Sequence, residues 1–515
     1  MRLVIFHYHL LPGGVTQVIT SSAIAVLKYL PDLDGITLVS GNNENTDNVV
    51  AGIKAKLDIS ISSRSDIECI ILPELGYISD MKKYPYPENL KKILRKHFAG
   101  NIWWIHNYHL GKNPFFTEAL LQIAEESPEQ TMVLQIHDFP EESRYSNLES
   151  LHKYVTQPLY PVCSNIKYVT INSRDRNYLI TAGIPEKMVF LLNNPVESLK
   201  NKDNINYYTK IDKILSKSEP SYMKGAPLMI YPVRTIRRKN VLEAGLLAKC
   251  STIPVNILPT LPGVSKTEIG YSKIVDNCFM GKLIPGASQA GIVLESEGIT
   301  FANIMNAGKI IISSSVQEGF GYLFINSLQW GKPLIARDLD IVKDFKNIFS
   351  TKFSNFYKSV DIPLRATLRK ELKIEYSKKI SELGKFYSKE IISNLKKQKS
   401  QIMEENNIDF SYLSPIMQRE FLIDLKDYGL LKETRQMNAG TLQQIELMLS
   451  MDMNNFEGPD IEKFSLPNHA EQIENIISSL KNGIKSASPP KRNINSSITS
   501  SFVNFASISL LNDPV

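Results

Sequence analysis

Two successive series of short apolar runs, separated by segments of helical pattern, constrain this chain most. In the first 195 residues the runs are LVIF, ITLVS, CIILP, NIWWIH, MVLQIH and YVTIN. After a polar stretch a second series follows: PLMIYPV, PVNILP, GIVLE, KIIISSS and PLIA. β-rich runs that alternate with helical segments are typical of parallel sheets with crossover helices. The sequence therefore predicts an α/β protein with two successive Rossmann-like domains.

Length and composition agree with a multidomain globular protein. The chain has 515 residues, of which 43% are hydrophobic and 22% charged. No stretch approaches the roughly 18 to 20 apolar residues that a membrane-spanning helix needs. The four cysteines are far apart and form no C-x-x-C pair, so neither a disulfide framework nor a zinc site is indicated. We therefore expect a reduced, cytoplasmic protein.

Composition shifts suggest five segments along the chain. The first Rossmann-like domain is predicted over residues 1–199 and the second over 226–362. Between them, residues 200–225 are polar and are predicted to be a linker. Residues 363–485 are predicted to form a helical extension. The Ser/Asn-rich tail, 486–515, is expected to have little independent order, although its apolar FVNFASISLL segment could dock.

A basic helical segment begins the predicted extension. Apolar residues recur every three or four positions from Leu364 to Leu395, which predicts one long amphipathic helix. Residues 364–397 carry ten Lys/Arg against four Glu, an excess equal to the +6 of the whole chain. We expect no nucleic-acid partner, because nucleic-acid binders spread basic residues over a face with groove-reading elements. A solvated helix face is favoured, and peripheral contact with anionic lipid is the alternative.

Gly13 and Gly14 follow the first predicted strand and precede a helical pattern. Glycines at such a turn let the backbone approach a ligand, and helix N-terminal amides favour anions. A plain tight turn would use glycine as well, so both interpretations stay open.

Basic residues follow the first strand of the second domain, in YPVRTIRRKN. Arg234 ends the strand and Lys239 follows five residues later, with Arg237 and Arg238 between them. Guanidinium and ammonium groups beyond the carboxyl end of a parallel strand suit a diphosphate, at the edge where open α/β sheets bind ligands. A solvated basic turn is the alternative.

The segment EGFGYLFIN follows a buried strand and opens a predicted helix. Gly319 and Gly321 would expose amides to a phosphate, and Glu318 can accept hydrogen bonds from hydroxyls. Asn326 lies about two helical turns further on. A phosphate binder beside a hydroxyl-reading carboxylate predicts a site for a nucleotide sugar.

Together, PGGV, R-x4-K and EGFG resemble the retaining GT-B glycosyltransferases of family 4 over residues 1–345. INSRDRNYLITAGIPEKMVFLLNNPV is similar to the end of that family's first domain, and NCFMGKLIP, with Leu283, to its nucleobase loop. The resemblance implies the GT-B fold: two Rossmann-like domains facing a central cleft, here with a helical C-terminal extension. It implies hexosyl transfer from a UDP- or GDP-linked sugar to an acceptor hydroxyl, with no cofactor or metal.

The resemblance also assigns roles to residues. Arg234 and Lys239 would neutralise the diphosphate, Glu318 would hold sugar hydroxyls, and His137 would face the transferred sugar. The donor-binding residues implied by the resemblance are Gly13, Gly14, Arg234, Lys239, Leu283, Glu318, Gly319, Phe320, Gly321 and Asn326. Asn326 departs from the family, which has a second Glu there. An amide oxygen can still accept a ribose hydroxyl, so donor binding should weaken by only about 1 to 2 kcal/mol.

No metal site is expected. The histidines near predicted strand ends lack a tight metal-binding spacing, and Asp338 to Asp340 are interpreted as turn and helix-cap residues. The span from Gly281 to Glu318 is longer than is usual in the family, which predicts an insertion.

The acceptor is not legible in the sequence. Loops near 107–113 and 139–147 should bind it, and a small molecule, a saccharide or a glycolipid would suit their polar and aromatic residues. The alternative to an enzyme is a non-catalytic GT-B scaffold that binds a nucleotide or glycan. A dehydrogenase is disfavoured because the G-x-G-x-x-G turn is missing.

Overall fold

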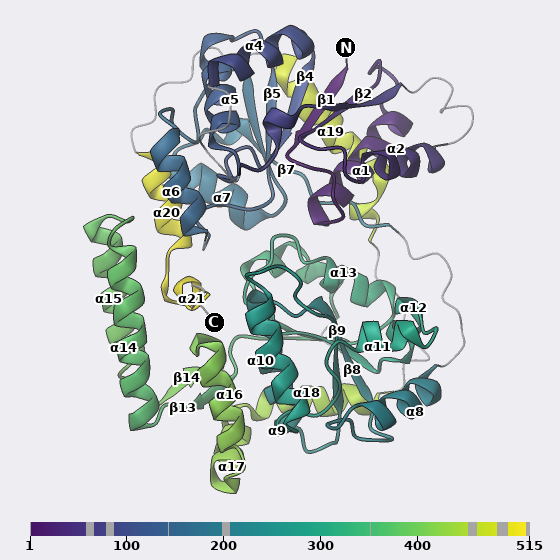
Figure 1. Ribbon diagram of the computed structural model, residues 1–515, viewed down its shortest axis with the longest axis vertical. Helices are drawn as coiled ribbons and strands as arrows, with labels where there is room; N and C mark the ends of the chain where they lie inside the picture. The colour runs from purple at the N-terminus through teal and green to yellow at the C-terminus, as the bar shows by residue number, and fades with distance from the viewer. Residues whose placement is uncertain are drawn as a thin grey trace. The chain divides into compact units, whose positions relative to one another are not determined.

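The chain forms two compact units, and the C-terminal region contributes to both. The computed structural model describes residues 2–57, 66–78, 87–142, 144–197, 207–350, 352–451, 461–481 and 493–510 (Figure 1). Unit 1 comprises residues 1–197 and 461–503, and unit 2 comprises 198–460 and 504–515. Each unit is built on its own parallel sheet, so the two Rossmann-like domains are confirmed.

Unit 1 contains a parallel sheet in the order β3-β2-β1-β4-β5-β6-β7. Its strands are β1 Leu3–His7, β2 Ile36–Ser40, β3 Ile67–Ile71, β4 Ile102–His106, β5 Met132–Ile136, β6 Ile166–Thr170 and β7 Val189–Leu191. The helices from the first part of the chain are α1 Gly14–Tyr29, α2 Thr46–Ala55, α4 Pro87–Phe98, α5 Pro114–Glu126, α6 Tyr145–Tyr154 and α7 Ser173–Ala182. The strand order reverses between β1 and β4, so their carboxyl ends border a crevice.

Unit 2 contains a parallel sheet in the order β12-β11-β10-β8-β9 and a small antiparallel pair, β13-β14. The strands are β8 Leu228–Arg234, β9 Asn256–Leu261, β10 Ile310–Ser313, β11 Leu334–Arg337, β12 Ser354–Tyr357, β13 Asp361–Pro363 and β14 Asn407–Asp409. Its helices before β12 are α8 Tyr208–Ser218, α9 Val241–Cys250, α10 Ile269–Met280, α11 Ala290–Ser296, α12 Phe301–Ala307 and α13 Tyr322–Gln329. Here the order reverses between β8 and β10.

One predicted strand is wrong. The run GIVLE lies in helix α11, where Ala290 and Leu294 are buried four residues apart and Ile292 faces outward. A short apolar run does not distinguish a strand from a buried helix by periodicity alone. Together α11 and α12 occupy much of the long span between α10 and β10 in which an insertion was predicted.

The predicted segment 363–485 is not a separate helical extension. Its first part, up to residue 460, belongs to unit 2, which also holds α16 Pro415–Asp424, α17 Tyr428–Met437 and α18 Ala439–Ser450. Helix α19 Leu466–Lys481 instead packs on α1 in unit 1. Its residue His469 lies between the Ser22 hydroxyl, 2.8 Å away, and the Asn193 carbonyl, 3.0 Å away. Burial of the apolar side chains of α19 stabilises this position, because they complete the core on one face of the first sheet.

The core position of α19 yields a stability prediction. Ile473 is 1% exposed within the core cluster of unit 1. We expect Ile473→Val to lower the free energy of unfolding by about 1 kcal/mol, because a buried methyl group is lost. Urea denaturation measures the change, and Ile374→Val on α14, where the side chain is 63% exposed, is the control with no expected effect. Equal stabilities of the Ile473 variant and wild type would contradict the packing of α19.

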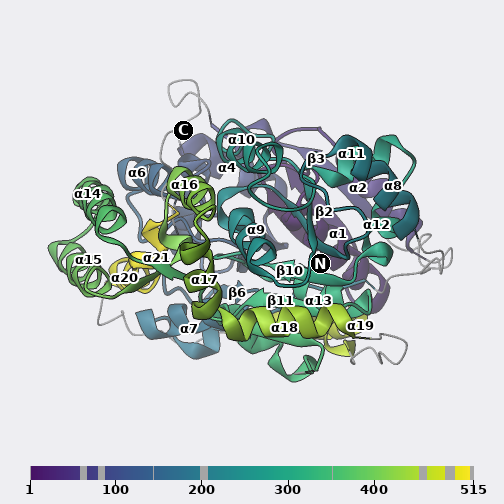
Figure 2. The ribbon, with the colours of Figure 1, turned by 90° about the horizontal axis from the view of Figure 1, so that it is seen from below.

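The single long basic helix predicted from 364 to 397 is also wrong. The structure has two helices, α14 Ala366–Leu383 and α15 Lys389–Ile402, which lie side by side in Figure 2. Lys399 Nζ donates to the Ser377 hydroxyl at 2.8 Å, so the pair is antiparallel. Gly384 ends the first helix, and the Ser388 side chain caps the second by accepting from the Ile391 N–H. These are ordinary helix stop and start signals, which the apolar period had obscured.

The predicted linker and tail contain helices. Residues 200–206 of the linker lie outside the described residues, and α8 follows within unit 2. In the tail, 486–492 and 511–515 also lie outside the described residues. Helix α20 Ile494–Phe502 packs on α7 in unit 1, and the short α21 Phe505–Ile508 packs on α15 in unit 2. The predicted docking segment FVNFASISLL therefore starts in one unit and continues in the other.

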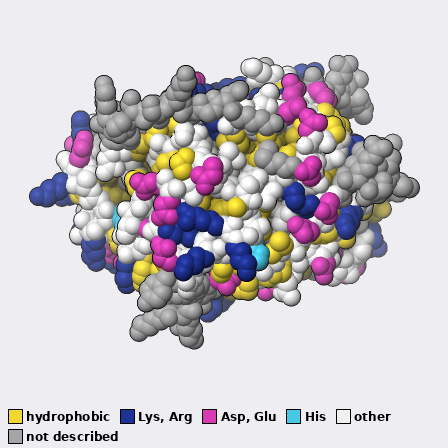
Figure 3. Space-filling view, turned by 90° about the horizontal axis from the view of Figure 1, so that it is seen from above, with side chains coloured by type: hydrophobic (Ala, Val, Ile, Leu, Met, Phe, Trp, Pro, Cys, Tyr) yellow, Lys and Arg dark blue, Asp and Glu magenta, His cyan; other side chains and the backbone are white. Residues whose placement is uncertain are grey.

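Among the described residues, no helix is both long and apolar enough to cross a membrane. On the face shown in Figure 3, the described Lys and Arg side chains are interspersed with Asp and Glu.

Candidate functional site

The loops after β8 and β10 meet at the point where the strand order of unit 2 reverses. The Ser314 hydroxyl donates to the Asn240 carbonyl at 2.9 Å, and the Val316 N–H donates to the Arg238 carbonyl at 2.9 Å. The Tyr231 hydroxyl donates to the Lys239 carbonyl at 2.7 Å. These bonds hold the basic loop against the start of EGFG.

Lys239 and Glu318 form an ion pair at this junction. Lys239 Nζ donates to Glu318 Oε1, and Arg238 Nη1 lies 3.5 Å from Glu318 Oε2. Both partners of the first pair are largely buried, with side chains 14% and 10% exposed. No role was predicted for Arg238 from the sequence, because the R-x4-K motif specifies only its first and last residues, Arg234 and Lys239.

The charges of this pair are set by burial and by each other. Burial would raise the pKa of Glu318, but Lys239 and Arg238 outweigh it and hold that pKa below its ordinary value. Burial lowers the pKa of Lys239, and Glu318 partly offsets this effect. Glu318 is therefore an ionised, acceptor-only group, which suits it to bind hydroxyl donors.

Two neighbouring arginines have different partners. Arg234 lies 3.5 Å from Glu268, and its side chain is half exposed. Arg237 donates to the carbonyls of Ser411 and Leu413 at 2.9 and 3.1 Å, which makes it a structural residue of unit 2. Of the predicted cationic pair, only Lys239 is placed directly on Glu318.

The glycines of EGFG lie at the start of α13 as predicted from the sequence. Gly321 has φ of +84°, and a Cβ there would lie 2.7 Å from the Phe324 ring, so only glycine fits. Phe320 is buried against Tyr322 and Phe345. Gly319 lies between Glu318 and this aromatic contact, and Asn326 lies half-buried on α13. Phe320 thus anchors the loop, and only its backbone is suited to reach a phosphate.

Leu283 lies in the loop after α10. Its side chain is 9% exposed, and its N–H donates to the Cys278 carbonyl at 2.9 Å. The contacts of the described residues do not connect Leu283 with Glu318. Its assignment to nucleobase binding stays a prediction.

His137 lies directly after β5, the strand next to β4 at the carboxyl edge of the first sheet. His106 Nδ1 and His137 Nε2 are 2.8 Å apart, and the His137 N–H donates to the Asn107 side chain at 2.8 Å. Burial lowers the pKa of His137 to about 4, so the ring is neutral at neutral pH. Asn107 begins the predicted acceptor loop 107–113, whereas His106, which ends β4, was not predicted as a site residue.

Gly13 and Gly14 begin α1 at the carboxyl end of β1. A Cβ added at Gly14 would meet no atom within 4 Å, and one at Gly13 only the Leu11 carbonyl at 3.9 Å. Gly13 is extended, with φ of 173°. Neither packing nor backbone conformation requires these glycines, which favours a ligand approaching the backbone.

The open space at Gly14 allows a test that separates function from folding. We expect Gly14→Ala to leave the protein at least as stable as wild type, since alanine is the better helix former by up to about 1 kcal/mol. Transferase activity should fall about tenfold or more, because the added methyl group displaces a ligand at the helix start. Gly52→Ala in α2, also with no atom within 4 Å, is the matched control and should keep full activity. Unchanged activity of Gly14→Ala would remove this loop from the site.

The two aspartates of D-x-D have lysine partners. Asp340 begins the 3-10 helix Asp340–Asp344 and pairs with Lys343 at 2.7 Å, and Asp338 lies 3.6 Å from Lys346. Among the described residues, no three His, Cys, Asp or Glu side chains are grouped so that they could hold a metal ion.

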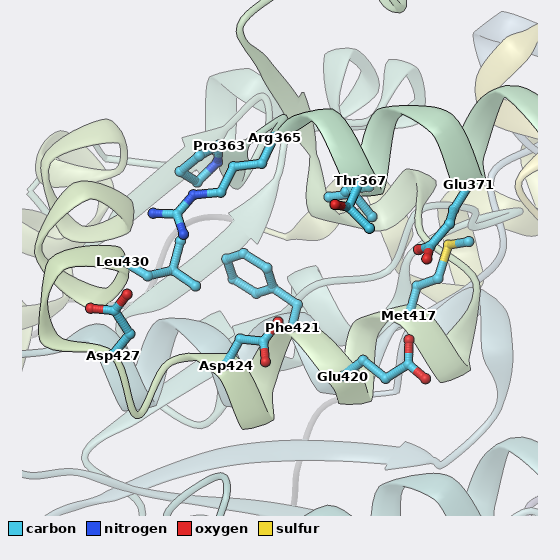
Figure 4. Close-up of a pocket in the computed structure, with 11 residues that line it drawn as sticks. Pro363, Arg365, Thr367, Glu371, Met417, Glu420, Phe421, Asp424, Asp427 and Leu430 are labelled. Atoms are coloured by element: carbon cyan, nitrogen blue, oxygen red, sulfur yellow. The ribbon is translucent and has the colours of Figure 1, made fainter.

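A cavity of about 580 Å³ lies elsewhere in unit 2, between α14, α16 and α17 (Figure 4). Its ionisable lining residues are Arg365, Glu371, Glu420, Asp424 and Asp427. Arg365 already faces Glu433 at 3.4 Å. The excess of carboxylates makes this cavity unsuitable for a nucleotide diphosphate, so the donor site is not there.

The chain is similar in sequence to a known enzyme and in structure to several solved proteins. No protein-family model matches the chain. The mannosylglucosyl-3-phosphoglycerate synthase of Petrotoga mobilis is 34% identical over 481 residues, which is 92% of this chain and 90% of that protein. Anabaena Alr3699/HepE in complex with UDP and glucose has a TM-score of 0.47 at 11% identity, covering 93% of this chain and 100% of its own. Sucrose-phosphate synthase from Thermosynechococcus elongatus has a TM-score of 0.47 at 10% identity, covering 93% of this chain and 99% of its own.

The identity to the Petrotoga protein covers 92% of this chain, so it extends over both units. The alternative of a non-catalytic scaffold is therefore disfavoured. The chain belongs to the GT-B glycosyltransferase family that includes this synthase, and it is an enzyme that transfers a sugar from a nucleotide-sugar donor.

Proposed function

We propose that the enzyme transfers a mannosyl group from a nucleotide diphosphate donor to glucosyl-3-phosphoglycerate, with retention of anomeric configuration and without a metal ion. The sugar and the acceptor follow from the product that names the Petrotoga relative. The observation that carries the proposal is the cluster of Lys239, Arg238 and Glu318 at the reversal point of the second sheet.

Cationic side chains take the place that a divalent ion has in other sugar transferases. Lys239 and Arg238 bind the donor diphosphate and stabilise the negative charge that develops on it as the sugar leaves. Arg234 adds a third cation, because its charge is near enough to Lys239 to lower the pKa of that residue. A fixed cation in a water-poor site supplies this stabilisation without an added metal.

Glu318 orients the sugar. Its ionised carboxylate accepts hydrogen bonds from sugar hydroxyls, while Lys239 keeps one oxygen in place. Retention follows if the leaving diphosphate accepts the proton of the acceptor hydroxyl on the face from which it departs. The new glycosidic bond then forms on that same face, and no protein nucleophile is used.

His137 provides a neutral partner in unit 1. Because its pKa is about 4, the ring carries no positive charge at neutral pH. It therefore does not compete with Lys239 and Arg238 for the diphosphate. It can exchange hydrogen bonds with a sugar hydroxyl while His106 fixes its orientation.

The test is transfer followed by product analysis. The enzyme is incubated with GDP-mannose or UDP-mannose and glucosyl-3-phosphoglycerate, with and without EDTA, and the product is examined by NMR. We expect an α-mannosyl product in both conditions, with one nucleotide preferred. A β-linked product would overturn retention, and loss of activity in EDTA would overturn metal independence. If neither donor supports transfer, the proposed donor sugar and acceptor are overturned.

A further inference from the structure

A row of aromatic rings runs along the carboxyl edge of the first sheet. It starts at His137 and passes through His106 and His7 to His9 and Tyr77. Successive ring centroids are 5.1, 6.4, 5.2 and 5.0 Å apart. The hydroxyl of Tyr77 lies 3.1 Å from His9 Nε2, and the Tyr77 side chain is 47% exposed. The row thus reaches from the residue assigned to the sugar out to the surface of unit 1.

Two cations lie where this row ends. Lys112 Nζ is 5.4 Å from the centre of the Tyr77 ring. Among the described residues, no carboxylate is within ion-pair distance of Lys112. Arg144 Nη2 lies 3.1 Å from Asp138 Oδ1, which uses only part of a guanidinium with five N–H donors. The cluster Lys112, Arg144 and Asp138 therefore has one more positive charge than negative.

The loops that carry these cations are fixed to each other. The Asn147 side chain donates to the Leu110 carbonyl at 2.7 Å, and the Asn107 side chain accepts from the His137 N–H. A Cβ at Gly111, where φ is +73°, would lie 2.6 Å from the Asn147 carbonyl. The two loops predicted to bind the acceptor, 107–113 and 139–147, therefore form one surface.

The electrostatics of Lys112 are those of a cation without a counter-ion. Burial lowers its pKa, and the nearby charge of Arg144 lowers it further. An arriving anion would offset both effects, because its negative charge stabilises the charged form of Lys112 and reduces the repulsion between the two cations. A phosphate and a carboxylate on one small molecule match a lysine point charge and an arginine fork.

We propose that Lys112 and Arg144 bind the phosphoglycerate end of the acceptor, while the ring row from Tyr77 to His137 contacts its sugar. This inference rests on the proposed function and names the acceptor subsite of that same reaction. It assigns specificity for an anionic acceptor to residues that lie far along the chain from the donor-binding motifs.

Steady-state kinetics with two acceptors tests the subsite. Wild type, Lys112→Gln and Arg144→Gln are assayed with glucosyl-3-phosphoglycerate and with its dephosphorylated form, glucosylglycerate. We expect each variant to raise KM for the phosphorylated acceptor about 10- to 30-fold, with KM for the donor unchanged. For glucosylglycerate, KM should change less than threefold. Lys153→Gln is the matched control, since Lys153 also lies over a tyrosine ring, Tyr154, at 5.0 Å.

Equal KM ratios between the two acceptors in wild type and in the Lys112 and Arg144 variants would overturn the subsite. So would an equal loss in Lys153→Gln. If wild type transfers sugar to neither acceptor, the proposed function fails, and calorimetry with 3-phosphoglycerate decides the subsite separately. Binding to wild type that is lost in Lys112→Gln would support it, and the same result for both proteins, including no binding to either, would overturn it.

Discussion

Replacing Lys239 by glutamine should lower kcat by about 10²- to 10³-fold, because a preorganised cation at the leaving diphosphate is removed. Lys239 is held by its carbonyl bond from Tyr231 and by its ion pair with Glu318, so its position is fixed before a donor arrives. Glutamine retains hydrogen-bonding ability on a side chain one bond shorter, and it carries no charge. Steady-state kinetics with saturating donor measure the change.

Lys343→Gln is the control for this prediction. Lys343 pairs with Asp340 at 2.7 Å and its side chain is 66% exposed, so the variant should keep wild-type kcat. A thermal melt of Lys239→Gln checks that the loss is not due to unfolding. A kcat within threefold of wild type in a folded Lys239→Gln enzyme would refute the role of this residue.

Arg337→Met should lower the free energy of unfolding by about 3–5 kcal/mol, since it leaves buried carboxylates without their partner. Arg337 donates to both oxygens of Glu243, at 2.8 and 2.5 Å, and to both oxygens of Asp409, at 2.9 and 2.6 Å. The Glu243 side chain is fully buried. Burial raises the pKa of Glu243, and Arg337 opposes this rise. Without Arg337, Glu243 would be buried as an unpaired charge or would take up a proton.

Chemical denaturation of unit 2 measures the loss. Arg365→Met provides the matched control, because Arg365 and Glu433 form an exposed pair that should contribute no more than about 1 kcal/mol. The result also bears on the site. Glu243 accepts from the Asn240 side chain at 2.7 Å, and Asn240 follows Lys239 directly. Equal stability of the two arginine variants would show that the buried network is dispensable.

The sequence predicted the sheets well because buried parallel strands are continuous apolar runs. LVIF and KIIISSS, for example, became β1 and β10, both interior strands of their sheets. The predictions failed where contacts between distant segments determine the structure. GIVLE has the composition of a strand, yet Leu294 is buried from a helix. No local signal indicated that α19 would leave the predicted extension and pack on α1.

The sequence identified the motif residues of the candidate site, but it did not identify the residues that contact them. Glycines and charged residues at strand ends identified Glu318 and Lys239, because the carboxyl ends of parallel strands converge at one edge. The sequence did not distinguish Arg238 from Arg234, since the two differ only in where the chain turns after β8. Nor could it pair His106 with His137, because that contact depends on the neighbouring positions of β4 and β5.

The return of α19 to unit 1 has a consequence for how the protein is made. Residues 198–460 are synthesised between the two parts of unit 1, so its core is incomplete when the ribosome has finished the first sheet. At about 5–20 residues per second, that interval is roughly 10–50 s. During this interval the surface that α19 later covers is exposed on the nascent chain, which makes the first unit a substrate for chaperones until α19 has been synthesised.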